Sequence, residues 1–146
     1  MSSHTAYSIL LAFYDAEREY MGAPTESRDF RILEPTLAKD AILIQTPALP
    51  YAGTYIGIEG LEDWAQRMSD TWSKVDVQNL QVFEREGSDH VISLSEVYFK
   101  SRKTGEELNF PMCQLITVDL EAGKVKSIRP FYWDVHAVNT VTQHVP

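Results

Sequence analysis

Cysteine is nearly absent from this sequence of 146 residues, which contains Cys113 alone. A single thiol excludes a disulfide within the chain and a zinc site built from cysteines. Cys113 stands among apolar residues, which predicts a small core residue rather than a nucleophile. The histidines are scattered at His4, His90, His136 and His144 with no His-x-x-x-His pair, so we expect no metal site.

Basic residues are in deficit, with 13 Lys and Arg against 21 Asp and Glu and a formal net charge of −8. This balance disfavours nucleic acid, because the phosphate backbone requires clustered cations, and it disfavours an anionic membrane surface. A long apolar run is also missing, since acids interrupt the N-terminal apolar positions before the roughly 18 residues that a membrane span requires. A signal peptide's basic start and cleavage site are missing as well. We therefore expect a cytoplasmic chain.

Phosphate-binding loops are missing too. Gly53, Gly57 and Gly60 have the wrong spacing for a dinucleotide loop, and the sequence contains neither a P-loop nor a Gly-x-Ser-x-Gly motif. We therefore expect no cofactor.

What is present is the composition of one globular domain over residues 1–146, with 44% apolar and 23% charged residues. Apolar residues spaced three and four apart predict a first helix that carries Ala6, Ile9, Leu10, Phe13, Ala16 and Tyr20 on one face. Asp29 is expected to cap a short second helix with Phe30, Leu33 and Leu37 inward. A third helix is expected from Glu59 or Gly60, with an apolar stripe of Leu61, Trp64, Met68 and Trp72.

Strands are expected in the rest of the chain. Branched residues predict a strand over 41–47, and prolines and glycines predict an irregular loop over 47–57. Alternating side chains then predict strands joined by tight turns, over 75–84, 90–100, 108–119 and 125–134. Helices first and hairpin strands later favour an α+β fold with the helices on one face of a curved antiparallel sheet.

The order of these features resembles a known superfamily. Helices precede the first strand, a Pro/Gly loop leads into Gly57-Ile-Glu-Gly60, and the last strand ends in the segment Arg129 to Asp134. The chain thus resembles the NTF2-like superfamily, and within it the SnoaL-like and ketosteroid-isomerase-like proteins. The resemblance implies a cone-shaped α+β barrel, with three N-terminal helices packed in a strongly curved antiparallel sheet. It also implies a deep apolar pocket for a small hydrophobic molecule and a homodimer formed through the outer face of the sheet.

The catalytic residues of these relatives match only in part. Tyr14 matches a tyrosine late in the first helix of the steroid isomerases, but Thr46 stands where those enzymes have their aspartate base. In the limonene-epoxide-hydrolase-like branch, Glu96 matches the first acid, whereas Leu94 and Phe131 replace the arginine and the second acid. The resemblance therefore assigns neither reaction.

Glu96 is the local anomaly in the predicted strands, because it interrupts a row formed by Ile92, Leu94 and Tyr98. Burying a carboxylate is unfavourable unless it is paired or protonated. This predicts a general acid/base in the cavity. The alternatives are an ion pair with Arg129, or a solvated face if the row points outward.

The end of the last predicted strand offers further candidates. Asp134 and His136 lie two residues apart. They either act as a proton shuttle or are surface residues near the C-terminus. Arg129, Phe131 and Trp133 share the opposite side, where Arg129 would hold an anionic or enolate oxygen.

Gln114 is polar in a row with Met112, and it either binds a substrate oxygen or is a buried structural amide. Aromatic residues are expected to line the pocket or to fill the core, and those proposed as substrate-binding are Tyr14, Tyr51, Tyr55, Trp64, Trp72, Tyr98, Phe131 and Trp133. Tyr51 and Tyr55 lie on the Pro/Gly loop and are predicted to be lid residues.

Two functional hypotheses follow. The first is a cofactor-free enzyme that acts on a hydrophobic oxygenated substrate of polyketide, terpenoid or steroid type, by acid/base isomerisation, cyclisation, dehydration or epoxide opening. The second is a non-catalytic ligand-binding or dimerisation module. A deep cavity with convergent polar groups favours the enzyme, and a cavity plugged by Trp64, Trp72 or Trp133 favours the module.

Overall fold

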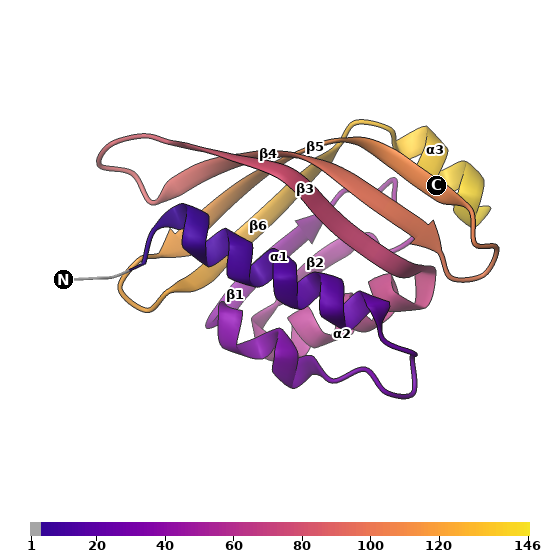
Figure 1. The fold of residues 1–146 in the computed structure, drawn as a ribbon, viewed down its shortest axis with the longest axis horizontal. Helices are drawn as coiled ribbons and strands as arrows, with labels where there is room; N and C mark the ends of the chain where they lie inside the picture. The colour runs from indigo at the N-terminus through magenta and orange to yellow at the C-terminus, as the bar shows by residue number, and fades with distance from the viewer. Residues whose placement is uncertain (1–3) are drawn as a thin grey trace.

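A computed structural model describes residues 4–146. Figure 1 shows two layers, a curved sheet and the helices α1 and α2 beneath its concave face. The helical elements are α1 (Ala6–Gly22), two short 3-10 turns η1 (Phe30–Ile32) and η2 (Glu34–Thr36), α2 (Gly57–Thr71) and α3 (Val135–Thr142). The strands are β1 (Leu37–Gln45), β2 (Gly53–Ile56), β3 (Trp72–Glu84), β4 (His90–Ser101), β5 (Glu107–Asp119) and β6 (Lys124–Tyr132).

The sheet has the order β2-β1-β6-β5-β4-β3. Hairpin connections make each of the neighbouring pairs β3–β4, β4–β5 and β5–β6 antiparallel, but β1 runs parallel to β6. The predicted α+β class and curved sheet are confirmed, whereas the prediction of a purely antiparallel sheet is wrong at this pair. The reason is that β1 reaches β6 through a long crossover that includes α2 and the four strands β2 to β5, and such a connection allows parallel neighbours.

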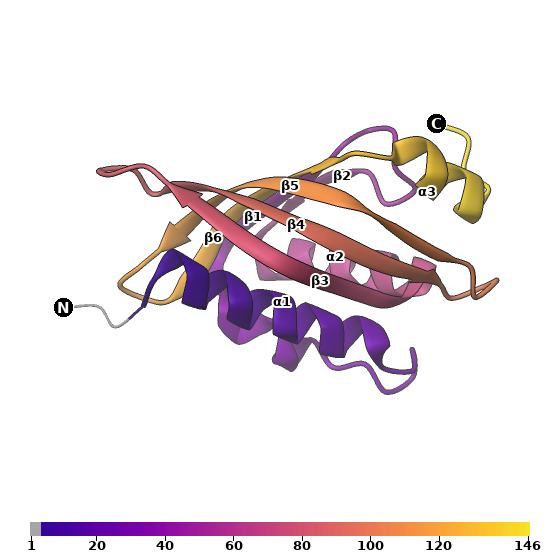
Figure 2. The ribbon, with the colours of Figure 1, turned by 45° about the horizontal axis from the view of Figure 1, so that its top comes forward.

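Irregularities in the strands bend the sheet around the helices. Asn79 adopts a φ of 55°, and the β3–β4 register shifts there between Gln78 and Gln81. A second register shift lies between Thr117 and Val118 on β5. Such bulges bend a strand and increase its twist, and Figure 2 shows the resulting curvature over α1 and α2.

Local signals explain α1. The Thr5 hydroxyl accepts from the Ser8 N–H, and the Ser8 hydroxyl accepts from the Thr5 N–H, which forms a reciprocal capping box. The predicted apolar stripe of this helix is buried. It packs on aromatic neighbours, and the Phe13 ring stacks on Trp64 of α2 at 6.5 Å between centroids.

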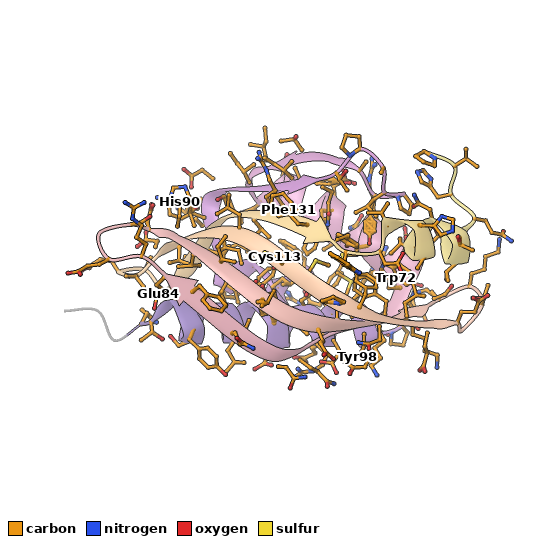
Figure 3. All side chains as sticks on the ribbon, turned by 90° about the horizontal axis from the view of Figure 1, so that it is seen from above. Trp72, Glu84, His90, Tyr98, Cys113 and Phe131 are labelled. Carbon is orange, nitrogen blue, oxygen red and sulfur yellow. The ribbon has the colours of Figure 1, made fainter. Side chains whose placement is uncertain are left out.

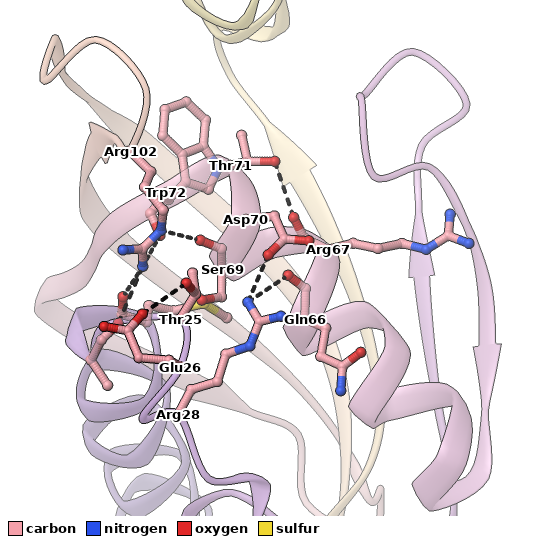
Figure 4. Close-up of polar contacts among 12 residues, drawn as sticks. Thr25, Glu26, Arg28, Gln66, Arg67, Ser69, Asp70, Thr71, Trp72 and Arg102 are labelled. Carbon is pink, nitrogen blue, oxygen red and sulfur yellow. Dashed lines mark hydrogen bonds and ion pairs between the residues drawn. The ribbon is translucent and has the colours of Figure 1, made fainter.

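Arg102 ties the ends of both long helices to the sheet (Figure 4). Its Nε donates to the Ser69 carbonyl at 2.6 Å, and its Nη2 donates to the carbonyls of Met21, Ala23 and Trp72 at 2.9, 3.3 and 3.2 Å. The last carbonyls of a helix lack partners within the helix. One guanidinium therefore satisfies the C-terminal ends of α1 and α2 together.

A second arginine fastens the loop that follows α1. Arg28 donates to Asp70 Oδ1 at 2.7 Å and to the Gln66 carbonyl at 3.3 Å, both on α2 (Figure 4). The two arginines fix α1 and α2 against each other at one end of the molecule.

Where the sequence predicted a short second helix, the structure has the two 3-10 turns η1 and η2. Asp29 does cap the first one, because its carboxylate accepts from the Arg31 N–H at 3.0 Å. Pro35 then removes a backbone donor, and the chain enters β1 at Leu37. Phe30, Leu33 and Leu37 are buried as predicted.

The loop predicted over 47–57 contains a strand. Residues Gly53–Ile56 pair antiparallel with Ile42–Gln45 of β1. The prolines at 47 and 50 precede this segment, so they do not prevent its pairing. α2 starts at Gly57, two residues earlier than the first predicted start.

The last predicted strand is also shorter than expected. β6 ends at Tyr132, and the Asp134 carboxylate accepts from the Ala137 N–H at 2.9 Å as the N-cap of α3. An aspartate followed by valines at positions 135, 138 and 141 is a helix signal that the strand prediction overlooked. Within residues 4–146, no helix is both long and apolar enough to cross a membrane.

Candidate functional site

An interior cavity of about 20 Å³ lies between the helices and the concave face of the sheet. A volume of this size holds about one water molecule. Most of its walls are apolar, and they include Phe13, Leu43, Met68, Val97, Phe99, Met112 and Ile128. The polar groups at its walls are Glu17, Gln45, Trp64, Gln114 and Tyr132.

Glu17 is the acid of this cavity. It lies on the inner face of α1, four residues after Phe13 and three before Tyr20, and only 6% of it is exposed. Its carboxyl forms no hydrogen bond or ion pair with any residue of 4–146. Burial in this apolar environment raises the pKa of Glu17 to about 8. The side chain is therefore a neutral carboxylic acid at pH 7.

Sequence reasoning missed Glu17, although a signal was available. Its position continues the predicted apolar stripe of the first helix, at the 3–4 spacing of Phe13 and Tyr20. An acid at an inward helical position is the same kind of anomaly that drew attention to Glu96 on a strand.

Two further polar groups at the cavity lack partners within the described part of the chain. They are Trp64 Nε1, a donor on α2, and Gln45 Oε1, an acceptor at the end of β1. The Gln45 side chain also interacts with the Tyr132 side chain. A neutral acid, a hydrogen-bond donor and an acceptor thus border the same small space.

Tyr14 and Gln114 form a neighbouring buried network. The Tyr14 hydroxyl donates to Gln114 Oε1 and lies 3.0 Å from Ser93 Oγ. Burial raises the pKa of Tyr14 well above its ordinary value, so the phenol stays protonated. Met112 and Gln114 face the interior, as their predicted row requires. Their role in binding a substrate remains a prediction.

The predicted lid tyrosines are core residues. The Tyr51 hydroxyl lies 2.7 Å from the Tyr132 hydroxyl and accepts from Trp72 Nε1 at 3.1 Å. The Tyr55 hydroxyl donates to the Tyr51 carbonyl at 2.9 Å. Tyr51 and Tyr55 are buried, and Trp72 is covered by a stacked Phe99. The loop carries these rings into the interior rather than over an opening.

Glu96 faces outward, and its expected position in the cavity is wrong. β4 buries the other row of its side chains, Val91, Ser93, Ser95, Val97 and Phe99, and leaves Ile92, Leu94 and Glu96 exposed. The two serines are small enough for α1 to approach, as the Tyr14–Ser93 contact shows. Glu96 accepts from the Tyr98 hydroxyl at 3.3 Å on the outer surface instead.

The other candidates at the C-terminal end are also separated from the cavity. β6 turns Ile128, Pro130 and Tyr132 inward, so Arg129 and Phe131 point outward, and Trp133 is 79% exposed. Asp134 caps α3 and His136 lies within α3. The predicted catalytic set of Glu96, Asp134 and His136 is therefore not brought together at the cavity.

Cys113 is half-buried on the outer face of the sheet, and its prediction as a core residue is wrong. It pairs across the strands with Leu94 on one side and Phe131 on the other. Figure 3 looks onto this face and shows Cys113 and Phe131 on it. Among the residues that the structure describes, no cluster of His, Cys, Asp or Glu side chains could hold a metal ion.

No family model and no curated protein matches this sequence, but solved structures share its architecture. TerC, co-crystallised with polyporic acid, is 15% identical with a TM-score of 0.74, over 94% of this chain and 98% of TerC. An NTF2-like protein from Burkholderia xenovorans LB400 is 22% identical with a TM-score of 0.69, over 93% of this chain and 94% of that one.

A third similar structure is a protein from Xanthomonas campestris pv. campestris that is provisionally assigned as a polyketide cyclase. It is 17% identical with a TM-score of 0.71, over 93% of this chain and 96% of that one. Identities this low establish the fold alone. The chain thus has the NTF2-like fold, which it shares with SnoaL-like and ketosteroid-isomerase-like proteins.

Proposed function

We propose that this protein is a cofactor-free enzyme that transfers a proton to and from an oxygen of a small hydrophobic substrate, with Glu17 as the acid. The observation that carries the proposal is the buried, unpaired Glu17 carboxyl at the wall of the interior cavity. A buried polar group without a partner destabilises a fold. Such a group is expected where chemistry requires it.

The protonation state defines the role of this residue. Because the pKa of Glu17 is raised to about 8, its carboxyl is protonated at pH 7 and can donate to a carbonyl, hydroxyl or epoxide oxygen. Trp64 Nε1 is a second donor at the same cavity, suited to hold negative charge that develops on that oxygen. The carboxylate left on Glu17 then takes a proton from the substrate or from water as the product forms, which restores the acid. Isomerisation, cyclisation, dehydration and epoxide opening all include such an oxygen-centred proton transfer.

Polyketide-type substrates are the class that the similar structures favour. The Xanthomonas protein carries a provisional assignment as a polyketide cyclase, and so does a similar structure from Pseudomonas putida KT2440. The cavity itself accommodates only an oxygen-bearing group, because its volume is about 20 Å³. The body of the substrate must therefore lie beside it.

The test uses 2-tetralone, a bicyclic ketone, in deuterated water. Proton NMR follows exchange of the hydrogens next to its carbonyl, in which a proton leaves the adjacent carbon and the step is accelerated when an acid donates to the carbonyl oxygen. We expect catalysed exchange by the wild type and a loss of about 100-fold in Glu17→Gln. Glu19→Gln, an exposed acid on the same helix, is the matched control and should exchange at the wild-type rate. Equal rates in all three proteins would remove Glu17 from the mechanism.

A non-catalytic binding module is the second candidate, and the small cavity favours it. Trp64 and Trp72 fill much of the interior, as expected for a scaffold. Calorimetric titration with polyporic acid distinguishes the two. Tight binding without exchange of 2-tetralone, and with no effect of Glu17→Gln on affinity, would support the module.

We also propose a homodimer. Apolar side chains run across the outer face of the sheet through the pairs Phe83–Ile92, Ile92–Leu115 and Leu94–Cys113. Phe83, Ile92 and Leu94 are exposed. A connected apolar patch of this kind is typical of a protein interface. In the proposed homodimer, a second copy of the chain covers this patch.

A further inference from the structure

A second pocket, of about 370 Å³, opens on the outer side of the sheet where β1 and β6 separate. The parallel pairing of these strands reaches only from Leu37–Val125 to Leu43–Ile128. Pro130 follows on β6 and has no N–H to continue the ladder. The ends of the two strands therefore diverge and leave a gap in the sheet, beside the start of α3.

The chemistry of this outer pocket is amphipathic with one positive charge. Its apolar walls include Ile44, Pro47, Phe131 and Val135, and Arg129 is the one ionisable side chain other than Tyr132 among its walls. Arg129 forms no ion pair or hydrogen bond within residues 4–146. In a chain with a net charge of −8, an unpaired guanidinium beside apolar walls is a local site for an anion.

The outer pocket and the interior cavity share a wall. Gln45, Pro130 and Tyr132 border both spaces. The Tyr132 hydroxyl, within this shared wall, lies 2.7 Å from the Tyr51 hydroxyl. The outer pocket and the cavity that Glu17 lines are thus separated by the side chains of these three shared residues.

We infer that the outer pocket binds a hydrophobic carboxylic acid, with its carboxylate on Arg129 and its ring system against Ile44, Pro47 and Phe131. The volume of 370 Å³ accommodates a molecule of two or three fused rings. Arginine suits this role because its planar fork matches a carboxylate. The assignment rests on the proposed function for one point only, namely that an oxygen at the far end of the substrate reaches Glu17 past Tyr132.

The test compares 2-naphthoate with 2-naphthamide, which have the same ring system and differ in charge. Isothermal titration calorimetry at low salt should show that the naphthoate binds the wild type at least about tenfold more tightly. Arg129→Gln should remove that difference and leave the affinity for the naphthamide unchanged. Lys126→Gln removes a positive charge from the same strand, and this variant should still bind naphthoate more tightly than naphthamide. Equal binding of the two compounds to the wild type, or an equal loss in both variants, would overturn the assignment.

Methyl NMR locates the probe. Naphthoate should shift the methyl signals of Ile44 and Val135, which line the outer pocket, and leave those of Ile92 and Leu94 in place. Shifts confined to the latter pair would place the ligand on the outer apolar face and contradict the inference. Glu17→Gln should bind naphthoate as the wild type does, so a failure of the Glu17 proposal and a failure of the Arg129 assignment are separate results.

Discussion

Glu17 illustrates how one residue couples stability to the proposed chemistry. Its carboxyl is buried without a partner, so ionisation within the folded protein is unfavourable. The unfolded chain exposes the same carboxyl, which then has its ordinary pKa of 4.5. The folded state therefore retains a proton that the unfolded state loses.

The sign of the pH effect follows from this difference. Between about pH 4.5 and 8 the folded state binds more protons, so the free energy of unfolding decreases as the pH rises, by at most about 1.4 kcal/mol per pH unit from this group. We expect the free energy of unfolding of Glu17→Gln to lack this contribution to its pH dependence. Urea denaturation from about pH 5 to 9 should therefore show the variant gaining stability relative to wild type up to about pH 8, with a constant difference above it.

Glu19→Gln is the control for this experiment, because Glu19 is exposed on the same helix. Its stability should follow the wild-type pH profile. A Glu17→Gln profile parallel to that of the wild type would show that Glu17 ionises in the folded protein as it does in water.

Arg102 is predicted to have a large effect on stability because it joins both long helices to the sheet. Its guanidinium satisfies carbonyls of Met21, Ala23, Ser69 and Trp72. Arg102→Met keeps the side-chain length and leaves these acceptors without a donor, which should lower the free energy of unfolding by about 3 kcal/mol. Chemical denaturation measures the change, and Arg85→Met, at an exposed turn, should have little effect. Similar values for the two variants would contradict the structural role of Arg102.

At the scale of elements, α3 depends on its N-cap. The helix Val135–Thr142 is short, and Asp134 supplies its side-chain cap to the Ala137 N–H. Asp134→Ala should destabilise the protein by about 1 kcal/mol and accelerate amide hydrogen exchange within α3. Asp134→Asn retains a capping oxygen and should restore slow exchange. Equal exchange in the alanine and asparagine variants would show that the cap has no role.

The elements also show why strand prediction succeeded in position and failed in orientation. Both rows of β4 mix apolar and polar side chains, so alternation locates the strand without naming its inner face. Packing against α1 makes that choice, because Ser93 and Ser95 allow the helix to approach while Tyr14 bonds to Ser93. The row of β4 with the larger side chains, which includes Glu96, therefore faces outward.

At the scale of the whole molecule, the outer face of the sheet predicts the oligomeric state. Multi-angle light scattering should give the mass of two chains for the wild type. Leu94→Glu places a charge within the apolar patch of Phe83, Ile92, Leu94, Cys113 and Leu115 and should yield a monomer. Lys103→Glu, at the exposed β4–β5 turn, should remain dimeric. A monomeric wild type would refute the proposed dimer.

The sequence by itself determined the class of this fold and the identity of most of its elements. Periods of 3–4 residues in the first helix and of two residues in the long strands are local properties, which each segment carries wherever it is placed. The cap at Asp29 and the inward row of Met112 and Gln114 were readable for the same reason. The four residues of β2 were missed because so short a segment contains little periodic signal, whereas α3 was missed because its cap and its valine spacing were overlooked.

The tertiary structure decided which of these residues meet. Glu17 on α1, Gln45 on β1 and Trp64 on α2 border one cavity only because the sheet curves around both helices. The parallel placement of β1 beside β6 likewise opens the outer pocket next to Arg129. Such neighbours come from segments far apart in the chain, and whether a carboxyl is buried or hydrated depends on the packing of all of them at once.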